Sequence, residues 1–403
     1  MYLKQIRFEN IACFGDLNLD FTQTSGKPCP WVVLIGENGT GKSTVLQMIA
    51  LTLLGRDMVK DVAQGVDWGK FAGPHKVRGQ VEVLFLATKH DKKRKHQQGG
   101  YSYRTVFNLG PKIKTGLEQP YNFAKHDYDR LHETLYDSQN LINGWFACGY
   151  GPWRNLSKSL ITSRRVLATK PYRFATLFNP EYALTEVRDW LFELEFGVLK
   201  QSQAAERSKK LALHAFEKAL PGIKFKEVTQ DRDVIFEDNG VTVSIDQLSD
   251  GYRSTIAWIG DLVKRLIDAF PENKSLTDPL QAEGIVLIDE IDIHLHPKWQ
   301  RSIVETVRRL FPNLQFIVSS HSPFIAQDMR PEDKIIVFKK QNGRVKATED
   351  DGFVKGWRVD QILTSYLFDL ETTRDMYFSA QEKEYQQLLD LQAGGRLNKT
   401  NKE

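Results

Sequence analysis

The chain has 403 residues, of which 41% are apolar and 26% are charged, a balance typical of folded globular proteins rather than disordered ones. Its 55 basic and 51 acidic residues leave a net charge of +4, which neither requires nor excludes a nucleic-acid partner. Three cysteines without Cys-x-x-Cys spacing argue against a disulfide scaffold or a zinc ribbon, and favour a reducing, cytoplasmic setting. No apolar run approaches the ~18 residues that span a membrane, and the start, MYLKQIRFEN, lacks the apolar core of a secretory signal.

The first third of the chain predicts strands around one glycine-rich turn. Apolar residues that alternate or run together favour five strands, at 2–9, 17–21, 31–35, 79–87 and 101–108. The run at 31–35 (WVVLI) has the pattern of a strand buried on both faces. A helix is expected over 42–54, so the local order is strand, glycine loop, helix.

The remainder alternates helices and strands. Apolar side chains at helical spacing predict helices over 185–220, over 252–270, and from Pro297 through Leu310. Further strands are expected at 144–150, 223–228, 233–237, 241–245, 284–288, 314–320 and 334–339. This alternation predicts an α/β fold with a mostly parallel central sheet. We expect three parts: 1–180 with an antiparallel β subdomain, a short helical insert at 181–222, and 223–403 with a C-terminal helical tail.

Residues 36–43 (GENGTGKS) match the phosphate-binding P-loop pattern. Glycines let consecutive amides point at phosphate oxygens, and the following helix N-terminus favours an anion. Lys42 is expected to bridge the outer phosphates and the Ser43 hydroxyl to ligate Mg²⁺. An ordinary glycine turn is disfavoured, because a chance match in a chain this long is expected only ~1–2% of the time. The predicted nucleotide contacts are Gly36, Glu37, Asn38, Gly39, Thr40, Gly41, Lys42, Ser43 and Thr44.

Two carboxylates stand at the end of the apolar run GIVLIDE. Asp289 suits a Mg²⁺ ligand, directly or through water, and Glu290 can orient and deprotonate an attacking water; the alternative is a simple polar turn. His294 and His296 raise the possibility of a zinc site, but no third soft ligand stands nearby. His321, in SSHSP after the next strand, is either placed to hydrogen-bond a γ-phosphate or is an ordinary turn histidine.

Residues 248–253 (LSDGYR) stand before a predicted helix and form a second anion-binding helix start, through Ser249 and the following amides. Two such starts are most simply explained if they face each other across a site shared by two copies. The order GENGTGKS, LSDGYRS, VLIDEIDIHLHP, SSHSP resembles the P-loop ABC-type ATPase heads of the structural-maintenance-of-chromosomes (SMC), RecF and OLD group. The resemblance implies that Ser249 and Gly251 bind the γ-phosphate of an ATP held by the partner subunit's Lys42. It also implies that Asp292 acts at the dimer seam and that His321 is the switch histidine.

Three segments narrow the resemblance: GYGPWRN (149–155), LSDGYRS, and VDQILTSYLFDLETTRD (359–375). They are similar to the ATPase subunits (the PtuA family) of Septu-type anti-phage defence operons, which also occur beside some retrons. That similarity implies a Mg²⁺-dependent ATPase that forms a homodimer or larger homo-oligomer around ATP. It also implies an HNH-type nuclease subunit as partner, with nucleic acid reached through the complex.

The chain departs from the wider group's pattern in places. Asp250 and Tyr252 occupy the third and fifth positions of the LSGGQ-like element, and the stretch 10–14 (NIACF) lacks the arginine that many relatives carry in an NFR segment. The Q-loop glutamine is not identifiable. The basic stretch 89–96 (KHDKKRKH) is either a phosphate contact or a solvated hairpin tip. Trp153 and Arg154 either act near the nucleotide or the dimer seam, or simply pack.

Other functions remain open at this point. The helical insert is too short for long coiled-coil arms, and the residues after His321 hold no paired-carboxylate metal pattern, so neither a tethering protein nor an intrinsic nuclease is expected. A RecF-like repair ATPase and a scaffold that binds nucleotide without turnover are the two alternatives. The Asp289–Glu290 pair speaks against the scaffold.

Overall fold

The computed structural model describes residues 1–62, 71, 78–86, 101–108, 121–123, 145–154, 173–179, 186–220, 222–270, 278–350, 354 and 356–393. The basic stretch 89–96 and Asn155 lie outside these residues. The chain forms two compact units, 1–355 and 356–403.

A six-stranded sheet runs through the larger unit. Its order is β14-β13-β3-β12-β11-β7, and every neighbouring pair is parallel except β13 and β14. The strands are β3 (Trp31–Gly36), β7 (Trp145–Tyr150), β11 (Glu283–Ile288), β12 (Leu314–Ser319), β13 (Lys334–Gln341) and β14 (Arg344–Asp350). The predicted mostly parallel sheet is confirmed. β14 was not predicted, because its sequence RVKATED is charged and largely exposed.

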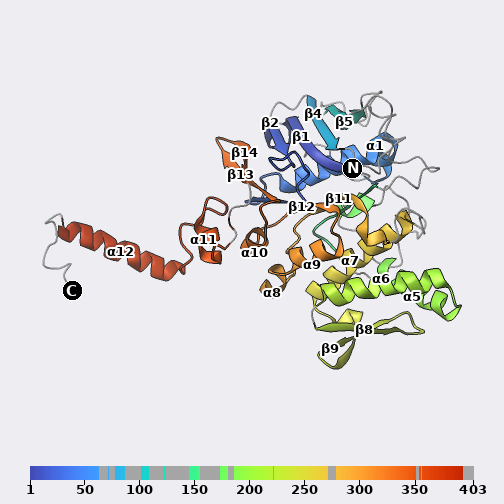
Figure 1. Cartoon of the computed structure of the whole chain (residues 1–403). Coiled ribbons are helices and arrows are strands. Elements are labelled where there is room, and N and C mark those ends of the chain that lie inside the picture. The colour runs from blue at the N-terminus through green and yellow to red at the C-terminus, as the bar shows by residue number, and fades with distance from the viewer. Residues whose placement is uncertain are drawn as a thin grey trace. The chain divides into compact units, whose positions relative to one another are not determined.

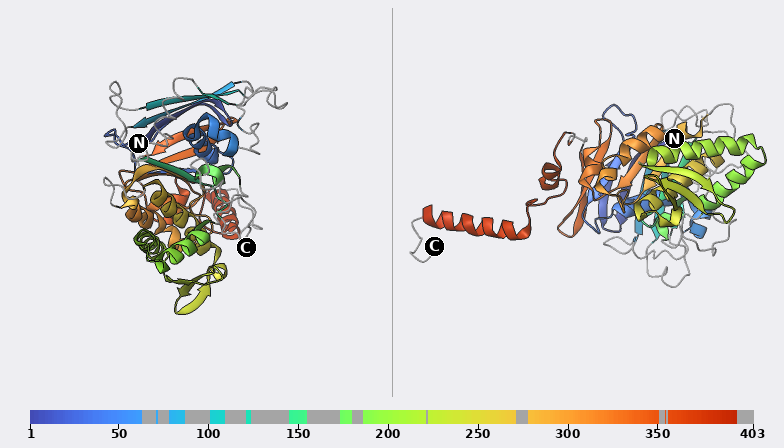
Figure 2. Two further views of the ribbon diagram at one scale, coloured as in Figure 1. Left: turned by 90° about the vertical axis from the view of Figure 1, so that its right-hand side faces the viewer. Right: turned by 90° about the horizontal axis from the view of Figure 1, so that it is seen from below.

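An antiparallel sheet of order β2-β1-β4-β5-β6 lies over one face of the central sheet, with helix α1 (Lys42–Val62) between the two (Figures 1 and 2). Its strands are β1 (Tyr2–Ile11), β2 (Phe14–Asp20), β4 (Arg78–Leu86), β5 (Tyr101–Asn108) and β6 (Tyr121–Phe123). Alternate residues of the parallel strands, such as Val32 and Leu34, are buried in the same core as Val45 and Ile49 of α1. This alternation is the period of two expected of a strand with both faces covered. The expected antiparallel subdomain is therefore present, and α1 extends eight residues past its predicted end.

Helices α7 (Asp250–Ala269) and α9 (Ile303–Leu310) lie on the opposite face of the central sheet (Figure 1). Helices α5 (Glu186–Leu199) and α6 (Gln203–Ala219) pack against these helices on the side away from the sheet. A small sheet of β8 (Ile223–Val228), β9 (Val234–Asp238) and β10 (Val241–Ser244) follows the helical insert. The insert is two helices because Gln201 adopts a left-handed φ of 60° and Ser202 caps α6 by accepting a hydrogen bond from the Ala205 amide. Shorter elements are α4 (Ala175–Phe178), η4 (Ile245–Gln247), η5 (Pro279–Gln281), α8 (Pro297–Gln300) and α10 (Pro323–Gln327).

The single helix predicted from Pro297 through Leu310 is wrong, because α8 and α9 are separate. The break lies at Ser302, whose φ of −121° is not helical. Its hydroxyl donates to the carbonyls of Lys298 and Trp299, and such local bonds compete with the helical backbone.

The smaller unit contains α11 (Val359–Thr364) and α12 (Met376–Ala393), the helical elements expected of the tail. In the described part of the chain, no helix is both long enough and apolar enough to cross a membrane.

Candidate active site

The parallel strands deliver their carboxyl ends to one edge of the sheet. β3 leads into the P-loop, β11 into Asp289 and Glu290, β12 into Ser319–His321, and β7 into residues 151–154. Register pairs Ile288 with both Val318 and Tyr150, so these strands end at about the same level. In open α/β sheets this edge is where ligands bind.

The P-loop has the backbone that its glycines allow. Gly36, Gly39 and Gly41 have φ of 154°, 72° and 89°, in the region that favours glycine. The Lys42 ammonium donates to the carbonyls of Gly36 at 2.7 Å and Glu37 at 2.9 Å. The loop is thus folded as a phosphate cradle with its lysine turned onto main-chain oxygens.

Cys13, in the turn between β1 and β2, and Phe14, at the start of β2, pack against this loop. A Cβ placed on Gly41 would lie 2.4 Å from Cζ of Phe14 and 2.7 Å from Sγ of Cys13. The stretch that lacks the relatives' arginine therefore supports the P-loop by packing, with Cys13 and Phe14 as the contacting residues.

Asp289 and Glu290 are held at the end of β11 by backbone and hydroxyl contacts. The Asp289 amide donates to the Tyr150 carbonyl at 2.8 Å. The Ser319 hydroxyl donates to Oδ1 of Asp289 and accepts from the Glu290 amide at 2.8 Å. Glu290 has a left-handed φ of 50°, which is uncommon for a residue with a Cβ.

Charged side chains interact at this edge, and among the described residues no ion pair joins them. Burial lowers the pKa of Lys42, against the effect of Asp289, Glu290 and Asp292. Burial and the neighbouring carboxylates raise the pKa of Glu290. Burial and then the Lys42 charge lower the pKa of His321, which favours the neutral imidazole. The structure thus brings together the predicted Lys42, Asp289, Glu290, Asp292 and His321.

Arg154 sits under this cluster. It is 2% exposed, and its guanidinium donates to the carbonyls of Asp289 at 2.8 Å and Glu290 at 2.7 Å. Burial lowers its pKa to about 10, although Asp289, Asp292 and Glu290 oppose this. Trp153 beside it is 53% exposed.

The second predicted anion-binding element begins α7. Ser249 is the N-cap residue in an extended conformation, its side chain makes no capping hydrogen bond, and it is exposed. Gly251 is buried against the segment after Glu290, where a Cβ would meet the His294 carbonyl at 2.5 Å. The Tyr252 ring meets the Trp299 ring edge-on, with 4.0 Å between the ring centres. The tyrosine at the fifth position of the LSGGQ-like element therefore has a packing role.

The alternative zinc reading of the two histidines finds no support. Nδ1 of His296 accepts a hydrogen bond from the Lys298 amide at the start of α8. Among the described residues, no group of three or more His, Cys, Asp or Glu side chains is placed to hold a metal ion.

The donors nevertheless fit Mg²⁺ bound together with a nucleotide. Ser43 and Asp289 are hard oxygen donors, and such a cation takes few protein ligands beside phosphates and water. Asp292 has a buried Oδ1 without a hydrogen-bond partner in the described structure. Because buried carboxylate oxygens are normally hydrogen-bonded, we expect a ligand or a partner to contact this oxygen.

Ser319 was not predicted as a site residue, and the role of Arg154 was left open. Ser319 is the last residue of the buried strand β12, two residues before His321, and a polar side chain at that position is a usable signal. The contact of Arg154 with Glu290 depends on β7 lying beside β11, which no local pattern reveals.

Two family profiles match the chain, and solved structures share its fold. A family profile described as "AAA domain, putative AbiEii toxin, Type IV TA system" matches residues 158–326, and one described as "AAA domain" matches residues 5–166. The SMC head bound to the C-winged helix domain of ScpA superposes with a TM-score of 0.52 at 14% identity, over 87% of this chain and 98% of that one. An SMC head domain with an extended coiled coil, bound to the C-terminal domain of ScpA derived from Pyrococcus furiosus, gives 0.52 at 14% identity, over 87% and 96%.

Curated relatives are similar to this chain in sequence. Septu protein PtuA of Bacillus mycoides (strain KBAB4) is 28% identical over 386 residues, which is 92% of this chain and 45% of that protein. "Retron Ec83 probable ATPase" of Escherichia coli is 26% identical over 421 residues, covering 89% and 75%. Septu protein PtuA of Bacillus thuringiensis is 31% identical over 176 residues, covering 42% and 44%. The chain thus spans less than half the length of either Septu protein. It has the SMC head fold and the motifs of an AAA/SMC-type ATPase, and it is similar to Septu PtuA and to retron ATPases.

Proposed function

We propose that this chain is a Mg²⁺-dependent ATPase that dimerises around ATP and regulates an HNH-type nuclease subunit in cytoplasmic anti-phage defence. The observation that carries the ATPase part is the convergence of Lys42, Asp289, Glu290 and His321 at the carboxyl edge of one sheet. The dimer and the nuclease rest on the similarity to Septu PtuA.

Each residue has a distinct task in hydrolysis. Lys42 exchanges its two main-chain acceptors for the β- and γ-phosphates. Ser43 and Asp289 would hold Mg²⁺, and the cation would neutralise phosphate charge. Glu290 takes the proton of the attacking water as the new P–O bond forms and the bond to the β-phosphate breaks, leaving ADP and phosphate. His321 donates a hydrogen bond to the γ-phosphate.

A phosphate-release assay on the purified chain tests the chemistry. Lys42→Ala should lose nucleotide binding, while Glu290→Gln should still bind and turn over roughly 10²–10⁴-fold more slowly. A thermal melt of each variant checks that it is folded. Hydrolysis by Glu290→Gln at the wild-type rate would remove the assigned base, and the absence of turnover in the wild type would favour the scaffold.

The dimer is tested separately through Ser249. Because Ser249 is exposed and its hydroxyl is not used for capping, it is available to a nucleotide held by a second copy. On a Glu290→Gln background, ATP should convert monomer to dimer in size-exclusion chromatography, and Ser249→Arg should prevent this without abolishing ATP binding. Ser202→Arg, at the exposed N-cap of α6, is the matched control and should leave the dimer intact.

The nuclease partner is tested with neighbouring genes. Co-expression followed by affinity purification should recover an HNH-type subunit, and DNA and RNA cleavage by the complex should differ with and without ATP. Family analogy favours ATP as a restraint. Recovery of recombination proteins in place of a nuclease would favour the RecF-like alternative.

A further inference from the structure

We propose that Arg154 is a positioning residue that fixes the backbone of Glu290, and with it the catalytic carboxylate. The inference rests on the proposed ATPase function and adds a residue that acts through the main chain.

The contacts form a fork. Nη1 of Arg154 donates to the Asp289 carbonyl at 2.8 Å and to the Gly151 carbonyl at 3.4 Å, and Nη2 donates to the Glu290 carbonyl at 2.7 Å. A guanidinium presents its donors in a rigid plane, so two neighbouring carbonyls held by one fork are fixed in relative orientation. Arg154, in the segment that follows β7, therefore fixes the orientation of the peptide units on either side of Glu290.

Glu290 needs such a restraint. Its φ of 50° is unfavourable for a residue with a Cβ, and such conformations persist only where the surroundings over-determine them. The Ser319 hydroxyl holds the Glu290 amide at 2.8 Å, and Arg154 holds its carbonyl. The peptide units on both sides of the Glu290 Cα are thus fixed, and the side chain leaves in one direction.

The Arg154 guanidinium bonds main-chain carbonyls and forms no ion pair with the carboxylates of the site within the described residues. Within the described ranges, no carboxylate oxygen is within ion-pair distance of Arg154, and its bonds go to main-chain and hydroxyl oxygens. A salt bridge to Glu290 would occupy the oxygen that must accept the water's proton. Bonding to the carbonyls provides positive charge near three carboxylates without blocking any of them.

The same guanidinium reaches α7. Nε of Arg154 lies 3.5 Å from Oγ of Ser254, one turn into the helix that starts after Ser249. Arg154 therefore lies between the strand end that carries the proposed base and the helix that carries the proposed partner contact. Arg154 thus contacts both elements.

Arg154→Lys is the test variant, because a lysine keeps the charge but cannot span two carbonyls as a fork. Arg308→Lys is the matched control: Arg308 is a largely buried arginine that forks onto Asp333, away from Glu290. Both variants are compared with the wild type for ATP turnover, nucleotide affinity, thermal unfolding, and amide hydrogen exchange of a peptide covering 287–295.

Arg154→Lys should lower turnover at least tenfold while nucleotide affinity stays within threefold. It should speed exchange of the 289–291 amides at least tenfold, and Arg308→Lys should do neither. Unchanged exchange in Arg154→Lys, the same exchange in both variants, or faster exchange with wild-type turnover would each overturn the proposal. A wild type without ATP turnover would refute the proposed function alone, since the exchange comparison would still decide whether Arg154 fixes Glu290.

Discussion

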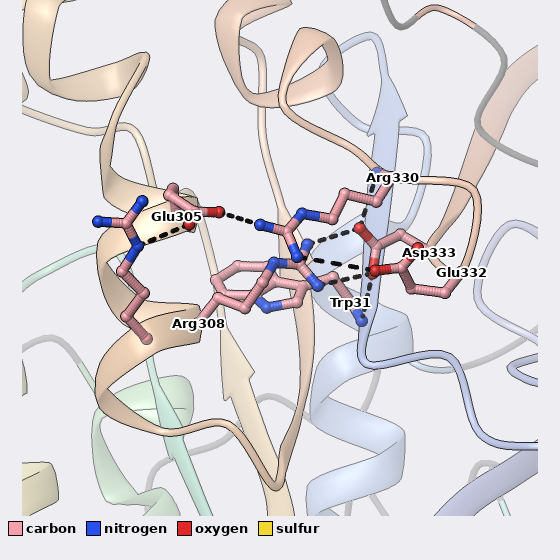
Figure 3. Close-up of polar contacts among 7 residues, drawn as sticks. Trp31, Glu305, Arg308, Arg330, Glu332 and Asp333 are labelled. Carbon is pink, nitrogen blue, oxygen red and sulfur yellow. Dashed lines mark hydrogen bonds and ion pairs between the residues drawn. The ribbon is translucent and has the colours of Figure 1, made fainter.

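The two edges of the central sheet handle charge in opposite ways. At the carboxyl edge, Lys42 and Arg154 donate to main-chain carbonyls, while a buried oxygen of Asp292 has no partner in the described structure. At the amino edge, where β3 and β13 begin, the buried carboxylate is surrounded by donors (Figure 3). The first edge keeps carboxylate oxygens available for a ligand. At the second edge the Asp333 carboxylate is paired with both Nη atoms of Arg308, although Nε of Arg308 is also buried without a partner in the described structure.

Asp333 is the centre of the amino edge. It is 3% exposed and accepts from the Trp31 amide, both Nη atoms of Arg308 and the Arg330 amide, at 2.6–3.2 Å. Burial raises its pKa even though Arg308 opposes the shift, so the ionised form depends on these partners. Arg308 also lies 5.7 Å from the centre of the Trp31 ring, and Arg330 continues the network to Glu305 on α9.

The contrast between the two edges separates charges that stabilise the fold from charges that are available to a ligand. A compensated buried pair fixes structure, because removing one partner leaves an unpaired charge. A cluster of charged groups without ion pairs suits a ligand that completes it, and the anion-binding loop favours the proposed nucleotide as that ligand. The comparison predicts that the two edges respond to different perturbations.

Asp333→Ala should have the largest effect on stability. It leaves Arg308 buried without its carboxylate, which typically costs about 3–5 kcal/mol, while turnover per folded molecule should stay at the wild-type level. Urea unfolding and phosphate release at low temperature measure the two quantities. A stability loss below about 1 kcal/mol, or a parallel loss of turnover in folded protein, would break the distinction between the edges.

Bound nucleotide should raise the free energy of unfolding only through contacts at the carboxyl edge of the sheet. With Mg²⁺ and ATP at 100 times the dissociation constant, the free energy of unfolding of Glu290→Gln should rise by about 2.7 kcal/mol. The increment should persist when Asp333→Ala is added and vanish when Lys42→Ala is added. Nucleotide-dependent stabilisation that survives Lys42→Ala would place the ligand elsewhere.

Gly41→Ala should distort the phosphate loop and lower the free energy of unfolding moderately. The left-handed backbone alone makes alanine unfavourable by about 1–2 kcal/mol, and the added Cβ would meet Phe14 at 2.4 Å. Nucleotide affinity should therefore fall at least tenfold, which a titration with fluorescent ATP measures. Gly343→Ala is the control, because it has a similar φ of 75° but open space around it, and it should cost stability without changing affinity.

Much of this site could be predicted from the sequence because its motifs are local. GENGTGKS and the acidic end of GIVLIDE each carry their own strand and turn, and the structure places both at one edge. Arg154 could not be assigned, and the partners of Ser319 could not be named, because these contacts join neighbouring strands whose order depends on the whole fold. The amino-edge network was missed for the same reason: Trp31, Arg308 and Asp333 are far apart in the chain, and none belongs to a motif.

The fold shows the same limit. Strands with continuous apolar runs were found, whereas β14 was missed because its exposed, charged sequence has no strong alternation. The break between α8 and α9 depends on the Ser302 hydroxyl bonding to carbonyls of the preceding turn, while the apolar spacing across it is helical. Hydrophobic period identifies which residues face the core, but not where a side chain interrupts the backbone.

The smallest effect is expected from the outer part of the amino edge. Arg309 donates to Glu305 at 2.7 Å, but its side chain is 78% exposed, and exposed ion pairs contribute only about 0–1 kcal/mol because solvent screens them. Arg309→Ala should therefore change the free energy of unfolding by less than about 0.5 kcal/mol, measured by urea unfolding beside Asp333→Ala. Raising the salt concentration should remove even this difference, since both partners are reached by ions, whereas the loss in Asp333→Ala should persist. A large, salt-independent loss in Arg309→Ala would mean that the amino edge is stabilised by its surface charges, and that burial of Asp333 does not account for the contrast between the edges.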